Sequence, residues 1–339
     1  MLRRKRFWFG LVISASFLAF FLARTDFDEI EHAFAGADFA LALAAVPLYF
    51  LGFWLRTMRW RYLLRPVNGG ITTRRLFPVV LIGLMANNVA PARVGELVRA
   101  YLLGERESMS KSTALGTIAV DRAFDGLTLV AILGIAVALS GADAAVKGIG
   151  VATALLFAAA SAVLVALAFS PRQARGWLLR LIRLLPASLA AAAEDLLDAF
   201  LSGLVALRSP RALASAALAS VGSWLVEASM YAVVGEAFHL GVGFEVYLII
   251  VAAANLALSI FASPGGVGPF EVATREALVF FNVGGAAASA YALALHALLL
   301  VPIIIVGLVL LWLTQLSLHE LFGVSKLPAA PVATSQGVE

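Results

Sequence analysis

The sequence of 339 residues predicts an all-α polytopic membrane protein, with about six full transmembrane helices and two re-entrant broken helical hairpins in an inverted repeat. Three observations predict this fold class. Hydrophobic residues make up 62% of the chain and charged residues 14%, far from the averages of soluble domains. Several apolar stretches reach the ~20 residues that cross a bilayer. Two stretches rich in Pro and Gly interrupt apolar runs in the two halves of the chain.

Composition also narrows the classes of function. The chain has no cysteine, which excludes disulfides, thiolate catalysis and Cys-ligated metals. The net charge of +4 does not indicate a nucleic-acid partner, because the basic residues lie beside apolar spans. The histidines show no metal-ligand spacing, and we expect each in a loop or at the lipid interface; they are His32, His239, His296 and His319. We expect no metal, no cofactor and no catalytic constellation.

The first two spans follow from the distribution of charge. The basic stretch 3–6 precedes the apolar run 7–23, which could be a signal peptide but has a poor cleavage site. We expect an uncleaved first span with a cytoplasmic N-terminus. The acidic loop 24–38 then lies outside and a second span over about 39–55 returns. The arginine-rich segment 56–75 is therefore expected in the cytoplasm, where positive loops stay.

The rest of the chain extends this topology. Residues 76–90 are apolar but too short to cross, so we expect a re-entrant pair of half-helices that enters and leaves from the cytoplasm. In chain order, the later predicted elements are an outgoing span over 113–139, a returning span over 149–169, an amphipathic cytoplasmic stretch over 170–211, an outgoing span over 212–237, a second re-entrant segment over 246–283, a returning span over 286–313, and a disordered tail over 326–339.

These elements form a single predicted transmembrane domain over 1–325, with inverted halves over about 39–140 and 212–313. The first re-entrant segment would enter from the cytoplasm and the second from outside, as an inverted repeat requires. The predicted location is the bacterial inner (plasma) membrane, with several passes and with both termini in the cytoplasm. The oligomeric state is open, and a homo-oligomer is one possibility.

The two interrupted stretches are Pro91–Glu96 and Pro264–Glu271, which lie 173 residues apart and share the order Pro, Val-Gly, Glu. Pro and Gly break helices. A broken backbone at membrane depth is tolerated only where protein buries it or where it lines a polar cavity. Such a pair at corresponding places in two halves indicates a substrate site at the interface of a repeat. The alternative is two tight turns that join ordinary helices.

Four motifs then carry a resemblance to a known family. They are Arg59-Trp60, Asn87-x-x-x-Pro91-Ala-Arg93-x-Gly95-Glu96-x-x-Arg99, Gly116-Thr-Ile-x-x-Asp121-Arg122-x-x-Asp125 and Pro264-Gly-Gly-Val-Gly268-x-x-Glu271, in this order. Together they resemble the lysylphosphatidylglycerol synthase transmembrane region, whose members are often called flippase-like integral membrane proteins. The resemblance covers roughly residues 5–320.

The resemblance implies a polytopic protein that handles lipids, with translocation of aminoacylated phosphatidylglycerol as the best-known activity of the family. Other relatives are linked to hopanoids or to lipid-linked sugars, and a lipid synthase is a possible partner. The full synthase carries a soluble acyltransferase-like domain after its membrane part. Because this chain stops at Glu339, we expect that it is not the aminoacyl transferase itself.

The first break has the chemistry of an anion site. If a helix restarts at Pro91, its free N–H groups and Arg93 on its first turn can hold a phosphate. Glu96 and Arg99 share a helix face, so Glu96 can anchor Arg99 or meet a cationic headgroup. The alternative is that these charged side chains simply lie at the cytoplasmic surface.

Charges inside apolar spans are the second set of candidates. Asp121, Arg122 and Asp125 lie about eight residues into a predicted span, where charges are costly and usually face the protein interior. They predict a gate or a polar track for a lipid headgroup, or else an ion pair that fixes helix register. Glu227 and Asn255 are further polar residues at predicted membrane depth, and Glu227 could instead serve a local hydrogen bond.

At the second break, Ser263 can cap a helix at Pro264, and the glycines that follow let the backbone approach a ligand closely. Pro269 can start the outgoing half-helix with Glu271 at its third position, and Glu271 can pair with Arg275 four residues on. The candidate substrate-binding residues are therefore Asn87, Asn88, Arg93, Glu96, Arg99, Asp121, Arg122, Asp125, Glu227, Asn255, Pro264, Gly265, Gly266, Gly268, Glu271 and Arg275.

The predicted function is movement of a phospholipid or other amphipathic lipid headgroup between leaflets. One alternative is a membrane-embedded lipid-modifying enzyme, in which the Asp121/Asp125 pair binds Mg²⁺ and a diphosphate. Such sites need two acidic clusters, and the sequence offers only this one. A second alternative is an accessory protein that docks a lipid synthase through a cytoplasmic surface such as 170–211.

Overall fold

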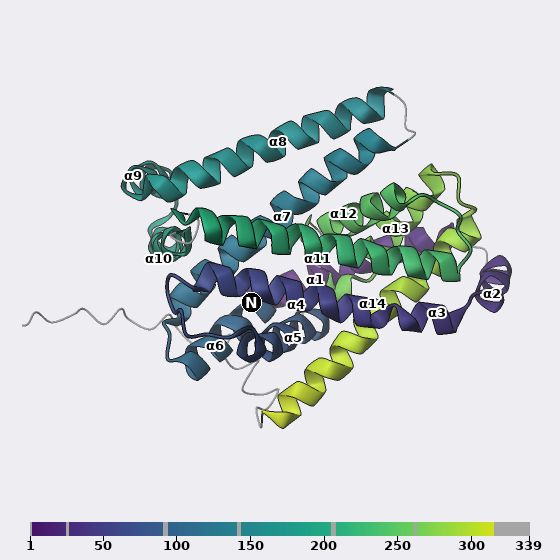
Figure 1. The fold of residues 1–339 in the computed structure, drawn as a ribbon, viewed down its shortest axis with the longest axis horizontal. Helices are drawn as coiled ribbons and strands as arrows, with labels where there is room; N and C mark the ends of the chain where they lie inside the picture. The colour runs from purple at the N-terminus through teal and green to yellow at the C-terminus, as the bar shows by residue number, and fades with distance from the viewer. Residues whose placement is uncertain are drawn as a thin grey trace, which may run out of the picture.

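The computed structural model describes residues 2–24, 27–90, 94–140, 144–204, 208–260 and 263–314, and these residues form helices without strands (Figure 1). The elements are α1 (Leu2–Ala23), α2 (Phe27–Ala35), α3 (Phe39–Ala44), α4 (Val46–Leu64), α5 (Thr73–Val89), α6 (Gly95–Glu107), α7 (Lys111–Leu139), α8 (Ala144–Phe169), α9 (Pro171–Ile182), α10 (Ala187–Gly203), α11 (Pro210–Ala237), α12 (Phe244–Ile260), the short 3₁₀ turn η3 (Pro264–Gly266), α13 (Pro269–Phe280) and α14 (Gly285–Leu313).

The long helices bear out a polytopic membrane protein. Among the described residues, four helical stretches are long and apolar enough to cross a bilayer: Phe39–Leu64, Lys111–Leu139, Pro210–Ala237 and Gly285–Leu313. They coincide with four of the predicted spans. At 26 residues α8 is equally long, and it exposes large apolar side chains such as Leu155 and Leu156. Such outward apolar surface is what a lipid-facing helix presents.

One predicted boundary is wrong. The second span was expected to end near residue 55, with Arg56 and Arg59 in a cytoplasmic segment, but α4 continues to Leu64. Arg59 is fully buried and Arg56 is half-buried. The physical reason is that both arginines find acidic partners on other helices, which the apolar profile of a single segment does not show. These contacts are described below.

The core of the bundle is an antiparallel pair, α4 and α11. The Asp38 N–H beside the start of α3 donates to the Ala237 carbonyl at the end of α11, at 2.9 Å. Deeper in the bundle, Arg59 on α4 contacts Ser220 on α11. The sequence numbers rise on one helix as they fall on the other, so the two helices run in opposite directions (Figure 1).

The two halves of the chain repeat one another's packing. In the first half α4 packs on α5, α5 on α6 and α6 on α7; in the second half α11 packs on α12, α12 on α13 and α13 on α14. Across the halves α7 packs on α12, and α5 packs on α14. The packing partners therefore match when the halves are exchanged. The division into two inverted halves is our interpretation of this pattern.

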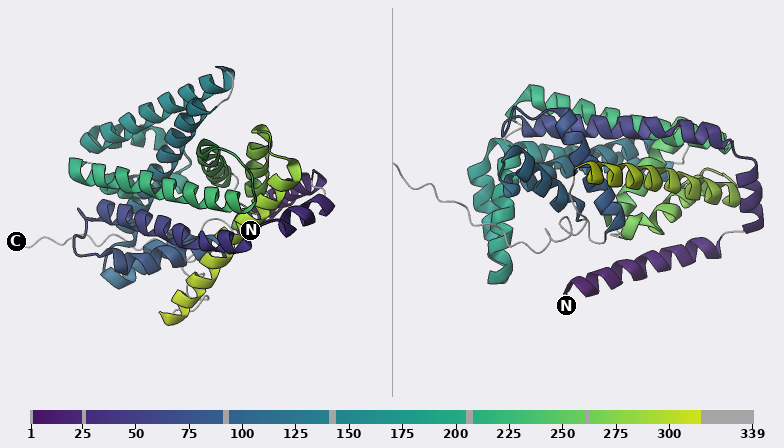
Figure 2. Two further views of the ribbon diagram at one scale, coloured as in Figure 1. Left: turned by 45° about the vertical axis from the view of Figure 1, so that its right-hand side comes forward. Right: turned by 90° about the horizontal axis from the view of Figure 1, so that it is seen from below.

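The two short hairpins lie toward opposite ends of the long helices. Figure 1 shows α5 and α6 toward the end where α9 and α10 lie, and α12 and α13 toward the end where α2 lies. Figure 2 shows α1 at the edge of the bundle, and it packs on α13 and η3. Each hairpin is thus flanked by long helices of its own half and closed by a helix of the other half.

The helix that follows the second break begins as the sequence predicts. Pro269 occupies its first position, and Glu271 at the third position accepts the Gly268 N–H at 2.7 Å. The helix after the first break begins at Gly95 rather than at Pro91. Pro91 to Arg93 lie outside the described residues, so the predicted anion site on Arg93 is not described by the structure.

The predicted amphipathic stretch 170–211 contains α9 and α10, which are joined by an ion pair from Arg175 to Asp198. Trp177 and Leu181 on α9 are exposed. This part of the chain lies at one end of the bundle, beside the N-terminal end of α11 (Figure 1). The predicted tail over 326–339 lies outside the described residues.

Candidate functional site

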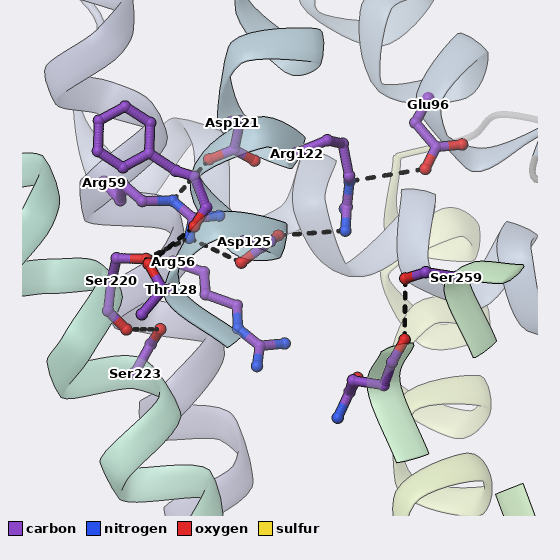
Figure 3. A network of polar contacts seen from close by, with 12 residues as sticks. Arg56, Arg59, Glu96, Asp121, Arg122, Asp125, Thr128, Ser220, Ser223 and Ser259 are labelled. Atoms are coloured by element: carbon purple, nitrogen blue, oxygen red, sulfur yellow. Dashed lines mark hydrogen bonds and ion pairs between the residues drawn. The ribbon is translucent and has the colours of Figure 1, made fainter. Parts of the chain in front are cut away.

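A buried ion network lies where α4, α6, α7 and α11 meet, with Arg59 of α4 at its centre (Figure 3). Arg59 Nε donates to Asp121 Oδ1 at 2.8 Å, and Nη1 donates to Asp125 Oδ1 at 2.7 Å. Nη1 also lies 3.0 Å from Ser220 Oγ. Asp121 and Asp125 are one helical turn apart on α7, so a single planar guanidinium can hold both carboxylates.

Two further arginines bond the remaining oxygens of these two carboxylates. Arg99 Nη2 donates to Asp121 Oδ2 at 3.2 Å, and its guanidinium lies 4.1 Å from the centre of the Trp60 ring. Arg122 Nη1 donates to Asp125 Oδ2 at 3.3 Å, and its Nε lies 3.6 Å from Glu96 (Figure 3). Both oxygens of each aspartate therefore accept an arginine.

A second pair extends the network toward α12. Arg56, one turn before Arg59 on α4, forms an ion pair with Glu227 on α11. Its guanidinium lies 3.9 Å from the centre of the Trp224 ring. Asn255 Nδ2 on α12 donates to the other Glu227 oxygen at 3.3 Å. Glu227 thus connects the first half of the chain with both α11 and α12 of the second half.

The network is balanced in charge. Its members are four arginines and four carboxylates: Arg56, Arg59, Arg99, Arg122, Glu96, Asp121, Asp125 and Glu227. Buried charges of one sign are costly, whereas paired and hydrogen-bonded charges are tolerated. The formal charges of the network therefore sum to zero, and most of its members lie on helices that are long and apolar enough to cross a bilayer. Its arginines keep spare donors, since Arg56 Nε and Arg59 Nη2 have no hydrogen-bond partner within the described part of the chain.

The second break is built mainly from backbone. Gly265, Gly266 and Gly268 have φ angles of 61°, 77° and 96°, which L side chains rarely adopt. The Ser14 hydroxyl of α1 donates to the Val267 carbonyl at 2.5 Å, which ties the turn to the first helix. Glu271 holds the Gly268 N–H. The turn thus depends on a few specific bonds rather than on a regular helix.

His296 of α14 closes this turn, and the prediction that it lies in a loop or at the lipid interface is wrong. Only 5% of its surface is exposed. Its Nδ1 lies 2.5 Å from Glu271 Oε1 and its Nε2 lies 3.0 Å from the Gly265 carbonyl oxygen. The ring stacks on Phe270 with the ring centres 4.4 Å apart. A buried carboxylate and a backbone carbonyl account for its position better than lipid contact does.

A cavity of about 580 Å³ lies between the two halves and joins both sets of residues. Arg56, Glu96, Arg122, Asp125 and Glu227 bring charge to its wall. Aromatic and aliphatic side chains from both halves line the rest of the wall. A concave site with a mainly apolar wall and a few convergent polar groups is typical of a ligand pocket.

Most of the predicted site residues lie on this cavity. Those that line it are Asn87, Asn88, Glu96, Arg122, Asp125, Glu227, Asn255, Gly265 and Gly266. Arg99 and Asp121 are buried beside the wall, where Asp121 accepts hydrogen bonds from both Arg99 and Arg59. Gly268 and Glu271 belong to the second break, beside the lining residue His296. Pro264 begins the turn η3.

Some predicted pairs do not form. Glu96 lies next to Arg122 rather than Arg99, and Glu271 pairs with His296 rather than Arg275. The partners of Arg275 lie outside the break. It contacts Ser289 at 3.1 Å and Glu276 at 2.5 Å, and donates to the Arg24 carbonyl at 3.1 Å. The Ser263 hydroxyl makes no capping bond among the described residues.

Three functional candidates were predicted to lie outside the site, in a cytoplasmic segment or at the lipid interface; they are Arg56, Arg59 and His296. A local feature could have indicated the arginines, since they are spaced three apart on the continuation of an apolar run and so share one helix face. His296 lies in the middle of the most apolar span, where an ionisable residue is by default a functional candidate.

The comparison with known proteins agrees with this architecture. Residues 7–307 match the family described as the lysylphosphatidylglycerol synthase TM region. The chain belongs to this family. The match covers every element of the ion network and the cavity described above, and it ends within α14.

Three named proteins are similar in sequence to this chain. The chain is 29% identical to glycosyltransferase AglD of Haloferax volcanii over 320 residues, which cover 85% of this chain and 51% of that protein. It is 38% identical to a UPF0104 membrane protein of Methanothermobacter thermautotrophicus and 28% identical to the UPF0104 membrane protein MJ1595 of Methanocaldococcus jannaschii. Each of these two matches covers 117 residues, 34% of this chain and 35% of the relative. The chain thus spans about half the length of AglD.

Proposed function

We propose that this protein moves the polar headgroup of a membrane lipid between leaflets, with an anionic or zwitterionic headgroup held in the cavity between the two halves. The observation that carries the proposal is the cavity itself. It is about 580 Å³ in volume and receives ionic side chains from α4, α6, α7 and α11 beside apolar side chains. A headgroup that leaves water for this cavity meets fixed charges, whereas a headgroup that leaves water for the bilayer core meets hydrocarbon.

The arginines suit a phosphate-bearing headgroup. Arg56 and Arg122 line the cavity, and each is held by carboxylates that do not use all of its donors. Guanidinium groups hold phosphate through paired hydrogen bonds, and each charge-assisted bond contributes about 1.5–3 kcal/mol. The carboxylates neutralise the charge of the arginines before a ligand binds. A charged headgroup then shares the arginines with these carboxylates, so it does not meet an isolated buried charge.

The relatives widen the range of lipids. The family name points to an aminoacylated phospholipid, while AglD is named a glycosyltransferase. A lipid-linked sugar is therefore the second substrate candidate, because its phosphate offers the same group to the arginines. Hopanoids lack that phosphate, and the cavity favours them least.

An enzymatic role for the aspartates is the rival proposal. Arg59 occupies one oxygen of both Asp121 and Asp125, and Arg99 and Arg122 occupy the others. Carboxylates that are already neutralised by guanidinium groups are poor ligands for Mg²⁺. Among the described residues, no group of three or more His, Asp or Glu side chains could hold a metal ion. These contacts favour transport. An accessory role beside a lipid synthase is the remaining alternative.

The cavity can be tested by filling it. Gly126 on α7 lines the cavity, and a side chain added there meets nothing within 4 Å. Gly126→Leu should therefore fold normally and slow the movement of labelled phosphatidylglycerol in proteoliposomes. Gly176→Leu on α9 is the matched control, because this glycine also has open space around it and lies away from the cavity. Equal rates in the two variants would contradict the proposal.

The orientation is part of the proposal, with both termini in the cytoplasm of a bacterial cell. Because the chain has no cysteine, single cysteines can report sidedness. Cysteines at Asp28 and Gly241 should react with impermeant thiol reagents from outside intact cells. Cysteines at Gly70 and Arg175 should react only after the membrane is opened. Labelling of the Gly70 position from outside would overturn this orientation.

A further inference from the structure

The pair Glu271–His296 is distinct from the arginine network, because its hydrogen bonds fix how many protons the pair holds. The Gly265 carbonyl oxygen can only accept a hydrogen bond, so His296 Nε2, 3.0 Å away, carries a hydrogen. On the other side of the pair, the Gly268 N–H donates to Glu271 Oε2 at 2.7 Å. The two side chains of the pair also contact each other directly.

That contact joins His296 Nδ1 and Glu271 Oε1 at 2.5 Å. In a neutral imidazole with its hydrogen on Nε2, Nδ1 has a lone pair, and an ionised carboxylate can only accept. Two acceptors do not approach to 2.5 Å without a proton between them. The pair is therefore either imidazolium with carboxylate or imidazole with carboxylic acid. In both forms it holds one proton more than a neutral histidine beside an ionised glutamate.

We propose that Glu271 and His296 form a proton-binding site that couples proton loss to opening of the Pro264–Gly268 turn on the cavity wall. When the proton leaves, either the Gly265 carbonyl loses its donor or Nδ1 and Oε1 face one another as lone pairs. The first bond ends on Gly265 of the turn, and the second ends on Glu271, whose other oxygen accepts the Gly268 N–H of the turn, so the loss of either bond is transmitted to the turn. The proton passes to water through the cavity, which His296 lines.

Few other hydrogen bonds hold the turn, which also packs on α1 and α5. Within the described residues its further tertiary hydrogen bond is the one from Ser14 to Val267, while Gly266 bonds locally to Ser263. Positive φ angles at Gly265, Gly266 and Gly268 allow the backbone to change at low steric cost. The loss of one bond out of so few changes the position of the segment that faces the cavity.

The surrounding charges are paired among themselves. Across the cavity, α4 presents Arg56 and α11 presents Glu227, which bond each other, while α6 and α7 present Glu96, Arg122 and Asp125 as a second group. On α13 itself, Arg275 bonds Glu276, and Arg24 at the end of α1 lies beside Glu276. The polar side chains of α5 and α12 that line the cavity are the uncharged Asn87, Asn88, Asn255 and Ser259. Glu271 is therefore paired with a histidine that shares a proton with it, whereas Glu227, Glu96 and Asp125 on the cavity wall are paired with arginines.

The inference rests on the proposed function for its link to lipid, and predicts that lipid movement responds to a proton gradient. The proton site itself can be tested without lipid transport. Ser263→Cys places a single thiol at the base of the turn, and Ser259→Cys on α12 places a control thiol on the same cavity wall. The rate of reaction with a small thiol reagent is measured in nanodiscs over mildly acidic to mildly basic pH.

The Ser263→Cys rate, divided by the Ser259→Cys rate to remove the effect of thiol ionisation, should rise severalfold as the pH rises. With His296→Gln added, the ratio should no longer change with pH. His239→Gln, at the end of α11, is the matched histidine control and should leave the pH dependence intact. A ratio that is constant with pH in the parent sequence overturns the proton site, whatever the substituted variants do.

The transport arm uses nitrobenzoxadiazole-labelled phosphatidylglycerol in phosphatidylcholine vesicles. An imposed pH gradient should shift the leaflet distribution of this lipid with the parent protein, and should not do so with Glu271→Gln or His296→Gln. Lipid movement that ignores the gradient would overturn the coupling and leave the proposed function standing. A pH-dependent thiol ratio without any lipid movement would support the proton site and count against the proposed function.

Discussion

The two breaks hold the same kind of backbone group with different chemistry. At the first break, the Gly95 N–H donates to the side-chain amide of Asn87 at 2.7 Å. At the second, the Gly268 N–H donates to the carboxylate of Glu271, also at 2.7 Å. An amide does not ionise and a carboxylate does. The comparison teaches that the two halves share packing but that, among the described residues, the backbone N–H of the first break is held by a group that does not ionise and that of the second break by one that does.

The long helices beside the breaks, α7 and α14, also differ in the ionisable side chains that they bring to the interior. In the first half α7 brings Asp121, Arg122 and Asp125 to the interior, all of them fixed by ion pairs. In the second half the corresponding helix α14 brings a single histidine, His296. In the proposed function the first half thus supplies permanent charge for an anionic headgroup, while in the proposed proton site the second half supplies a group that changes its charge. The predictions below separate these two roles, from the largest expected effect to the smallest.

Removal of the central arginine should have the largest effect. Arg59→Leu removes one of the two arginine partners from both Asp121 and Asp125, and breaking a buried ion pair costs about 3–5 kcal/mol. We expect a strong loss of thermal stability in detergent. Arg59→Lys should recover only a part, because an ammonium group cannot hold two carboxylates as a planar fork does.

The control for this prediction is Arg65→Leu, at the exposed end of α4. Its melting temperature should stay near that of the parent. If Arg59→Leu and Arg65→Leu melt alike, the ion network does not hold the first half together.

Loss of the amide at the first break should be the next largest effect. Asn87→Ala removes the acceptor of the Gly95 N–H, and an unpaired buried donor costs about 1–3 kcal/mol. Asn68→Ala is the matched control, because its side chain accepts the Gly70 N–H in an exposed turn where water can replace it. Chemical denaturation of both variants tests the difference. A loss in Asn68→Ala as large as that in Asn87→Ala would contradict a structural role for the first break.

A methyl group at the second break should cost somewhat less. Gly266 has a φ of 77°, and a Cβ there would meet the Leu258 side chain. A left-handed conformation costs an L residue about 1–2 kcal/mol, so Gly266→Ala should be destabilised by that amount. Gly126→Ala, with open space around it, should be neutral or slightly more stable, since Ala is favoured over Gly in helices. Melting temperatures that rank in the opposite order would show that the turn is not strained.

The smallest effect is expected outside the membrane segments, at the exposed pair between α9 and α10. Hydrogen bonds from Arg175 hold the pKa of Asp198 below its ordinary value. The pair therefore stabilises this region above the ordinary aspartate pKa of about 3.9, and the contribution is lost as the pH falls through the lowered pKa. Hydrogen exchange of α9 and α10 in Asp198→Asn should differ slightly from the parent at neutral pH and converge with it in acid. A difference that grows in acid would contradict this sign.

Sequence reasoning located the features that depend on neighbouring residues. The boundaries of α7, α11 and α14 lie within two residues of the predicted spans, because length and hydropathy are local properties. Asp121 and Asp125 could be identified because a charge inside an apolar run is visible at once. The interrupted stretches could be found for the same reason, since Pro and Gly are local helix breakers.

The features that were missed depend on residues far apart. The partner of Arg59 is 62 residues away on α7, and the Ser14 hydroxyl reaches Val267 across 253 residues. An arginine that follows an apolar run has the same sequence pattern whether it meets water or a buried carboxylate. His296 had no acidic neighbour along the chain, because its partner Glu271 belongs to another helix. Such pairings exist only once the helices are packed.

The antiparallel contact between α4 and α11 limits how the two halves can move. Rocking of one half against the other, as many transporters with repeats do, would pull Arg56 from Glu227 and Arg59 from Ser220 in an apolar setting. At the breaks the short hairpins are held by hydrogen bonds to backbone groups: the Gly95 N–H donates to Asn87, the Gly268 N–H donates to Glu271, and Ser14 and His296 bond the carbonyls of the second turn. We therefore expect the α4–α11 pair to stay fixed, and access to the cavity to change by bending of the short hairpins rather than by movement of whole halves.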